Sequence, residues 1–333
     1  MEYEYTPSTS NYAQYPVKVL ESTLHFMDGK NGEIKPVPLY ENKGCGDWGD
    51  QAPIEEDGTS YPMPEALWLR WWSVSEQKCY DMEMFLHPKK STRLWKEHAE
   101  GKESDRYKYF VFGMSPYGGV AVWIKASKKS VLLDWSYANE EELIEYEKNI
   151  LERLGLITEP TLLPPKEYFN QNMQQYTYRY IALDDYWDGN TWQLFDDDSD
   201  EMFCDHVEEM LFDGTRDQLG SEYLFDYHQA GMPQKLATIW YEGRDEYRVY
   251  FWIKREEALK VFQRVYYTKP DRRADFIIRF DLKAKKYELA LRPENIAQSI
   301  AIPQDGYEVL VLRNGNRCFQ SDNYSLAWDA WRW

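Results

Sequence analysis

The chain has 333 residues, which is enough for two domains of ordinary size. Hydrophobic residues make up 43% of it, with 14 Trp, 27 Tyr and 14 Phe, and this supply of large apolar side chains excludes wholesale disorder. The 57 acidic residues outnumber the 39 basic ones, and the net charge of −18 argues against binding to nucleic-acid phosphates or anionic membrane surfaces. A basic protein partner is compatible with this charge.

The first residues give an expectation about the compartment. Residues 1–15 contain neither a basic start nor an apolar run long enough for a secretory signal, and no later stretch has the length of a membrane span. Four widely spaced cysteines suit reduced thiols better than a disulfide framework: Cys45, Cys79, Cys204 and Cys318. We therefore expect a cytoplasmic protein, or a periplasmic or lipid-anchored one if a signal segment precedes Met1 in nature.

The first half of the chain reads as hairpins, a helix and further strands. An extended run over Tyr15–Phe26 closes on an Asp-Gly turn signal, and a second hairpin pairs Leu67–Ser73 with Cys79–Leu86. A helix is predicted to start at Pro88, because proline is tolerated in the first helical turn. Strands are predicted at 109–112 and 120–123.

A second helix is predicted over Glu140–Leu154. Asn139 can cap it with Glu142 reaching back, and Gly155 stops it. Its apolar residues fall on a single stripe: Leu143, Ile144, Tyr146, Ile150, Leu151 and Leu154. Prolines at 160, 164 and 165 then mark a stiff segment, 159–169, which we interpret as a linker.

An internal repeat connects the two halves. Residues 63–71 align without a gap on residues 232–240, sharing Met-Pro, Leu and Trp at the same spacing. After two residues are dropped at the next turn, Leu94 and Trp95 fall on Val261 and Phe262, and a second helix start falls at Arg255. Strand 109–112 falls on 276–279, strand 120–123 on 287–290, and Tyr176–Tyr186 resembles the run 15–26. The predicted fold is therefore α+β: two tandem, diverged modules at 1–158 and 170–333, each a mainly antiparallel sheet with one or two packed helices.

The first copy carries two recognisable patterns. One is Pro-x-x-Leu-x-x-x-Trp-x-Ser-x-x-Glu-x-Lys-x-Tyr, and the other is Gly-Met-Ser-Pro-Tyr-Gly-Gly-Val-Ala-Val-Trp. Their key positions are Pro64, Leu67, Trp71, Glu76, Tyr80, Gly113, Pro116, Gly118, Gly119 and Trp123. Over about residues 15–135 the chain resembles the bacterial domain of unknown function numbered 2931. It departs from the family pattern at Tyr117, where members usually run straight from proline to glycine, and the second copy keeps only the Met-Pro-x-x-Leu-x-x-x-Trp core.

The resemblance implies little about activity, because the family has no established one. Many members are lipoproteins of Gram-negative bacteria, and some of their genes lie beside genes for type VI secretion toxins, which suggests immunity proteins. Cys45 lacks the preceding apolar run of a lipoprotein signal. The resemblance therefore favours a cytoplasmic immunity protein that binds and neutralises a toxin.

The densest charge lies at residues 196–222, a segment with eleven acidic residues and a single basic one, Arg216. Phe203, Val207, Met210 and Leu211 have helical spacing, so an amphipathic helix with an acidic outer face is predicted. One interpretation is a solvated helix, and the other is a docking surface for a basic partner. The candidate partner-binding residues are Asp196, Asp197, Asp198, Asp200, Glu201, Asp205, Glu208, Glu209 and Asp213.

Metal and cofactor sites are not predicted. Asp196, Asp198 and Asp200 resemble the start of a calcium loop, but the glycine at the sixth position is missing and Val207 replaces the glutamate at the twelfth. Cys204 and His206 have no second Cys or His pair at ligand spacing. Ser115–Gly119 is interpreted as a tight hairpin turn, because it lacks both a nucleophile elbow and the ending of a phosphate loop.

We therefore predict a non-enzymatic protein-binding protein, an immunity protein that meets a secreted toxin through an acidic surface. One alternative is a carbohydrate-binding or surface-associated protein, since Trp68, Trp71, Trp72 and Trp240 alternate along strands and one set could be exposed. A second alternative is an enzyme with an unrecognised site. The sequence does not determine the oligomeric state.

Overall fold

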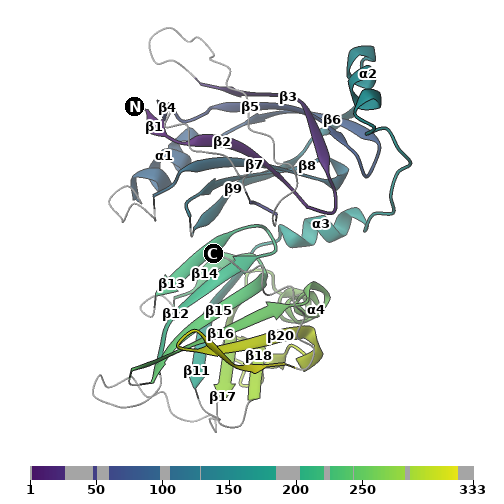
Figure 1. Cartoon of the computed structure of the whole chain (residues 1–333). Coiled ribbons are helices and arrows are strands. Elements are labelled where there is room, and N and C mark those ends of the chain that lie inside the picture. Colours follow the sequence, from purple (N-terminus) through teal and green to yellow (C-terminus); the bar gives the residue numbers. More distant parts are fainter. Residues whose placement is uncertain are drawn as a thin grey trace. The chain divides into compact units, whose positions relative to one another are not determined.

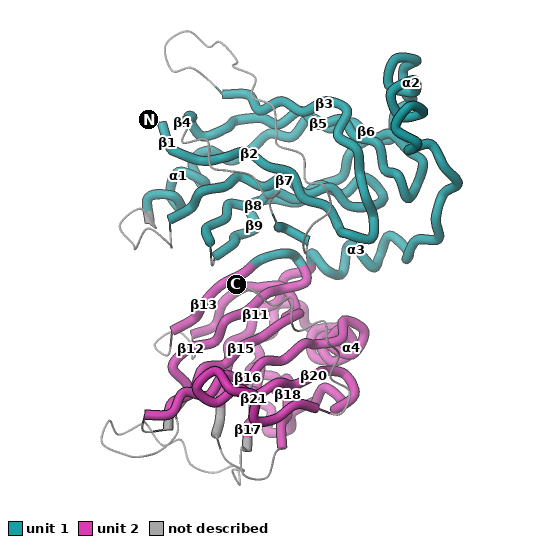
Figure 2. Tube along the Cα trace, viewed as in Figure 1, with its two compact units in different colours: residues 1–173, 213–215 teal, residues 174–212, 216–333 magenta. Residues whose placement is uncertain are grey.

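A computed structural model describes residues 2–26, 48–50, 60–97, 106–127, 129–184, 203–220, 226–242, 244–281 and 286–321 (Figure 1). The chain divides into two compact units, coloured separately in Figure 2. The first contains residues 1–173 and 213–215, and the second contains residues 174–212 and 216–333. The boundary after residue 173 lies just beyond the predicted linker, whose last residues already belong to a helix, α3 (Lys166–Asn172).

The first unit contains two main groups of strands. One has the order β10-β6-β5-β3 and is antiparallel throughout: β10 (Asn139–Glu141), β6 (Lys78–Phe85), β5 (Ala66–Ser73) and β3 (Val17–His25). The other has the order β2-β7-β8-β9: β2 (Thr6–Asn11), β7 (Tyr109–Ser115), β8 (Gly119–Lys125) and β9 (Ser130–Tyr137). Only the β2–β7 pair is parallel in this second group. The short strands β1 (Tyr3–Glu4) and β4 (Ser60–Tyr61) pair with each other.

The core of the first unit lies where the alternating apolar faces of these strands meet helix α1 (Pro88–Glu97). Trp71 of β5, Phe110 and Phe112 of β7, and Val122 of β8 are fully buried in one cluster. Trp95 of α1 stacks on Phe110 with an interplanar angle of 6°. A third helix, α2 (Glu145–Arg153), lies at one edge of the unit (Figure 1).

The second unit also has two groups of strands. One has the order β14-β11-β17-β18-β19: β14 (His228–Ala230), β11 (Tyr176–Asp184), β17 (Arg273–Asp281), β18 (Lys286–Pro293) and β19 (Ile300–Ala301). The other has the order β13-β12-β15-β16-β20-β21: β13 (Arg216–Gly220), β12 (Phe203–Leu211), β15 (Pro233–Glu242), β16 (Asp245–Ile253), β20 (Tyr307–Arg313) and β21 (Asn316–Gln320). Helix α4 (Arg255–Tyr266) buries Ala258, Val261, Phe262 and Val265 against the core.

The two units share an order of strands. In each, the hairpin before the main helix (β5–β6 or β15–β16) is flanked by an antiparallel strand on both sides: β3 and β10 in the first unit, β12 and β20 in the second. In each, the hairpin after that helix (β7–β8 or β17–β18) is flanked by a parallel strand on one side and an antiparallel strand on the other. These are β2 and β9, and β11 and β19. The run 15–26 therefore holds a different place in its unit from the described part of the run 176–186, because β3 pairs with β5 whereas β11 pairs with β17.

The predictions that rest on local sequence signals, the central hairpins and the starts of two helices, are confirmed. The structure is α+β, with the predicted central hairpins, and its helices α1 and α4 begin at Pro88 and Arg255. The helix predicted over Glu140–Leu154 is shorter than expected, because residues 139–141 pair with β6 as β10. Ile144 is the N-cap residue, and the Glu147 carboxylate, rather than Glu142, accepts the N-cap N–H at 3.0 Å.

We predict that Phe262→Ala destabilises the protein by about 3–5 kcal/mol, because a fully buried ring is lost and a cavity remains. Urea denaturation followed by circular dichroism measures the change. Tyr267→Ala is the matched control, since that ring is next to the same helix and 85% exposed, and it should change the free energy of unfolding by less than about 0.5 kcal/mol. Equal effects of the two substitutions would contradict the described packing of α4.

Candidate functional site

Three residues of the two family motifs, Ser73, Tyr80 and Tyr117, donate hydrogen bonds to the carboxylate of Glu76. This residue lies in the turn between β5 and β6. One oxygen, Oε2, accepts a hydrogen bond from Ser73 Oγ at 2.8 Å, and the other, Oε1, accepts one from Tyr80 OH at 2.9 Å. The backbone N–H of Tyr117, in the turn between β7 and β8, lies 3.0 and 3.1 Å from the two oxygens. One carboxylate therefore ties the turns of two hairpins together, and we refer to this arrangement as the Glu76 junction.

Backbone geometry explains the glycines of the junction. Tyr117 and Gly118 both have positive φ, 63° and 73°. A Cβ on Gly118 would lie 2.9 Å from the Tyr80 ring and 3.1 Å from the Ala138 carbonyl oxygen. A Cβ on Gly119 would lie 2.3 Å from Ser115 Oγ. The turn therefore needs glycine at both positions, and Tyr117 adopts the left-handed conformation with its N–H held by Glu76.

The remaining motif positions are packed inside the unit. Leu67, Trp71 and Trp123 are fully buried, and Pro64 and Pro116 are buried as well. A Cβ on Gly113 would lie 2.4 Å from the Trp123 ring, so this glycine makes room for the indole. Burial, followed by the neighbouring charge of Glu76, raises the pKa of Tyr80 far above its usual value, so Tyr80 acts as a neutral donor. The motif thus builds and locks the fold of the first unit.

The acidic segment differs from its prediction. Residues 203–211 form strand β12 rather than an amphipathic helix, paired with β13 and β15. Asp196, Asp197, Asp198, Asp200 and Glu201 lie outside the described residues. The physical reason for the wrong prediction is that both faces of β12 are largely covered, so apolar residues occur without strict alternation.

The four described carboxylates of the predicted partner-binding set lie in three places, since Asp205 and Glu208 both contact His206 and the other two do not. Asp205 has a half-exposed side chain and contacts the ring of His206 at 2.7 Å. Glu208 is buried, with an oxygen 3.6 Å from His206 Nε2. Glu209 is buried and accepts the Tyr180 hydroxyl at 2.5 Å, while Asp213 is fully buried and accepts the Thr215 N–H at 2.8 Å. These four residues do not make a single exposed acidic face.

His206 is held between two of these acids. Burial disfavours its charged form, but hydrogen bonds with Glu208 and Asp205, together with their charges, raise its pKa above the usual 6.5. The neighbouring Cys204 is buried, and burial raises the pKa of its thiol. Within the described part of the chain, no group of three or more His, Cys, Asp or Glu side chains could hold a metal ion.

The tryptophans considered for a sugar platform are covered. Trp71 and Trp240 are fully buried, and Trp72 is buried with its Nε1 donating to the Leu156 carbonyl at 3.1 Å. Trp68 is partly buried, with Nε1 at 3.2 and 3.3 Å from the two Asp81 oxygens. Among the described residues no tryptophan is exposed.

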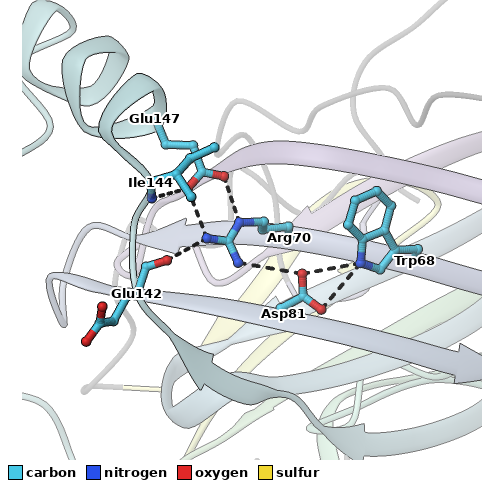
Figure 3. Close-up of polar contacts among 6 residues, drawn as sticks. All are labelled: Trp68, Arg70, Asp81, Glu142, Ile144 and Glu147. Atoms are coloured by element: carbon cyan, nitrogen blue, oxygen red, sulfur yellow. Dashed lines mark hydrogen bonds and ion pairs between the residues drawn. The ribbon is translucent and has the colours of Figure 1, made fainter.

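A second polar network, missed in the sequence, holds α2 on the outer face of the β5–β6 hairpin (Figure 3). Arg70 on β5 donates to Glu147 on α2 through Nε at 2.7 Å and through a terminal nitrogen at 2.9 Å. The same terminal nitrogen donates to the Glu142 carbonyl at 2.7 Å. The other terminal nitrogen of Arg70 lies 3.7 Å from a carboxylate oxygen of Asp81 on β6. The signal that could have revealed it is Glu147 itself, an acid spaced four residues from both Leu143 and Leu151 on the inner face of the helix.

The comparison with known proteins agrees with the motif geometry. The first unit is an α+β domain whose two hairpins are joined at a glycine-rich turn. Residues 2–184 match the family described as "Protein of unknown function (DUF2931)", so the chain belongs to this family. The match extends past the 15–135 region of the resemblance, through α2 and α3 to the end of β11. Neither a curated protein nor a solved structure matches the chain.

The described part of the chain contains no helix that is long and apolar enough to span a membrane.

We predict that Gly118→Ala destabilises the protein more than Gly155→Ala does. Both glycines have positive φ, 73° and 67°, so both substitutions cost about 1–2 kcal/mol of backbone strain. A Cβ at residue 155 meets open space, whereas one at residue 118 collides with the Tyr80 ring. The midpoint of urea denaturation measures the difference, and equal losses would contradict the crowding at the Glu76 junction.

A second prediction concerns pH. The hydrogen bond from Arg70 lowers the pKa of Glu147 below its usual 4.5, against the opposing effect of burial and with help from the Ile144 N–H. Because the folded pKa is the lower one, this carboxylate contributes full stability above the unfolded pKa and loses it as the pH falls through the folded pKa. Glu147→Gln should therefore destabilise the protein at about pH 7 and much less at about pH 3, measured by urea denaturation. Glu152→Gln, on the exposed side of the same helix, is the control and should show no such pH-dependent loss.

Proposed function

We propose that the chain is a non-enzymatic protein-binding protein. The observation that carries this proposal is the Glu76 junction, in which Ser73, Glu76 and Tyr80 of the family motif are engaged with one another. Both oxygens of Glu76 accept hydrogen bonds, and Tyr80 donates to one of them from a buried position. Polar side chains that are hydrogen-bonded to one another hold the fold together. A fold held in this way can act as a scaffold that presents a surface to a partner.

We further propose that the partner is a secreted bacterial toxin, associated with type VI secretion, which the chain neutralises in the cytoplasm by covering its working surface. Membership in the family and the net charge of −18 support a basic toxin domain as the partner. Asp205 is the described acid of the predicted set with the greatest exposure, and its contribution to an acidic docking surface stays a proposal.

The two units are, in this proposal, diverged copies of one module. The shared order of strands around each central hairpin supports it, as does the position of α1 and α4 directly after those hairpins. If the units are copies, Phe110 corresponds to Phe276, since both are fully buried and pair with Ile124 and Leu291. This register differs by one residue from the sequence alignment, which placed Tyr109 opposite Phe276.

The test is a growth-rescue experiment with toxin genes that neighbour the gene for this chain. Coexpression of the full chain should restore growth of cells that produce the cognate toxin, and titration calorimetry with a catalytically inactive toxin should give a salt-sensitive complex. Asp205→Lys should weaken binding if the acidic surface takes part. Glu209→Lys is unsuitable, because it would bury a cation against Tyr180.

Rescue that persists without a complex would overturn the occlusion mechanism. Absence of both rescue and binding for every neighbouring toxin would overturn the immunity proposal itself.

A further inference from the structure

Helix α2 exposes large apolar side chains. Tyr146, Ile150 and Leu154 follow one another at intervals of four residues, so they share one face of the helix, which we call the α2 stripe. Tyr146 is 69% exposed, Leu154 is 55% exposed, and Ile150 is partly exposed. Ile144 and Ile157, which flank the helix, are 60% and 39% exposed. A contiguous set of exposed apolar residues on one short element marks an interaction surface.

The fold holds this helix firmly in spite of its exposure. A nine-residue helix is marginal in isolation, so α2 depends on its attachments. At its start, Arg70 binds the Glu147 carboxylate and the Glu142 carbonyl. Leu151 on the inner face is fully buried in a cluster with Trp72 and Cys79.

The segment after the helix is fixed as well. The side chain of Gln77 donates to the Leu156 carbonyl at 3.1 Å and accepts the Thr158 N–H at 2.7 Å. Trp72 Nε1 donates to the same Leu156 carbonyl. Both ends of α2 are thus attached to the β5–β6 hairpin, and a preorganised helix loses little conformational entropy when a partner binds.

The charged residues around α2 indicate what kind of partner can bind the α2 stripe. Six exposed acids lie on α2 or within six residues of it, against two exposed bases: Glu140, Glu141, Glu142, Glu145, Glu152 and Glu159 against Lys148 and Arg153. Glu140 and Glu147 are already paired with Lys78 and Arg70. An acidic surround repels a second copy of the same surface and an anionic lipid headgroup, and it attracts a cationic segment.

We infer that the α2 stripe and its acidic surround form the docking site for a basic amphipathic helix of a protein partner. The apolar face of such a helix covers Tyr146, Ile150 and Leu154, and its Lys and Arg side chains reach the surrounding carboxylates. This inference rests on the proposed protein-binding function and assigns a place to it in the first unit.

The test uses two synthetic amphipathic helical peptides of about 18 residues, one built from Leu and Lys and the other from Leu and Glu. Fluorescence anisotropy with the full chain should show binding of the Leu-Lys peptide alone. Tyr146→Ser with Leu154→Ser should weaken it roughly tenfold or more, which is about 1.4 kcal/mol or more. Tyr267→Ser, which removes an aromatic ring that is 85% exposed in the second unit, is the matched control and should leave the affinity unchanged.

Amide hydrogen exchange locates the bound peptide. Protection confined to residues 144–157 supports the inference, whereas protection elsewhere, or an affinity that the double variant does not change, overturns it. Circular dichroism of the double variant confirms that the fold is retained, and Glu145→Lys with Glu152→Lys provides a second variant that should weaken binding and reduce its salt dependence.

Three other outcomes would also overturn the inference. A dimer in analytical ultracentrifugation that the double variant abolishes would assign the stripe to a second copy and overturn the inference. Binding to phosphatidylglycerol vesicles through the stripe would overturn it in favour of a membrane surface. If a cognate toxin binds the chain with equal affinity in the presence and absence of the Tyr146 and Leu154 substitutions, the inference fails while the proposed function stands.

Discussion

The fold of the first unit depends on one carboxylate shared between two turns. The β5–β6 and β7–β8 hairpins belong to different groups of strands, so little in their own backbone pairing fixes one turn against the other. Glu76 supplies that connection through Ser73, Tyr80 and the Tyr117 N–H. Charge-assisted hydrogen bonds are stronger than neutral ones, and three donors repay the cost of partly burying the carboxylate. The glycines follow from the close approach that this connection requires.

The parts of the fold that sequence predicted are those with local signals. Pro88 marks the start of α1, and the alternation over Leu67–Ser73 marks β5, because each feature acts within a few residues. The predicted start of α2 was wrong. Asn139 and Glu142 have the same spacing as a capping pair, but residues 139–141 pair with β6 and form a strand. Pairing with a strand that is distant in the sequence produces no signal in the neighbouring residues.

The acidic segment shows a different limit. Val207, Glu209 and Leu211 lie on one face of β12, and His206, Glu208 and Met210 lie on the other, with five of the six side chains buried. A strand covered on both faces shows no alternation, and its apolar residues can mimic helical spacing by chance. The role of Glu209 was equally hidden, because its partner Tyr180 lies 29 residues earlier on another strand. Glu76 and Tyr80 were identified from the sequence, but the approach of the Tyr117 N–H to Glu76 depends on the packing of two hairpins.

The attachment of α2 explains how a small helix can keep apolar residues for a partner. A helix held only by hydrophobic burial turns its apolar side inward and leaves a polar surface. Here the ion pair of Arg70 with Glu147, both largely buried, and the hydrogen bonds to Leu156 and Thr158 carry much of the attachment. A buried ion pair adds little net stability, yet it fixes position strongly, since separating the partners would leave an uncompensated charge. Polar attachment on the inside therefore leaves Tyr146 and Leu154 exposed on a helix whose orientation is already set.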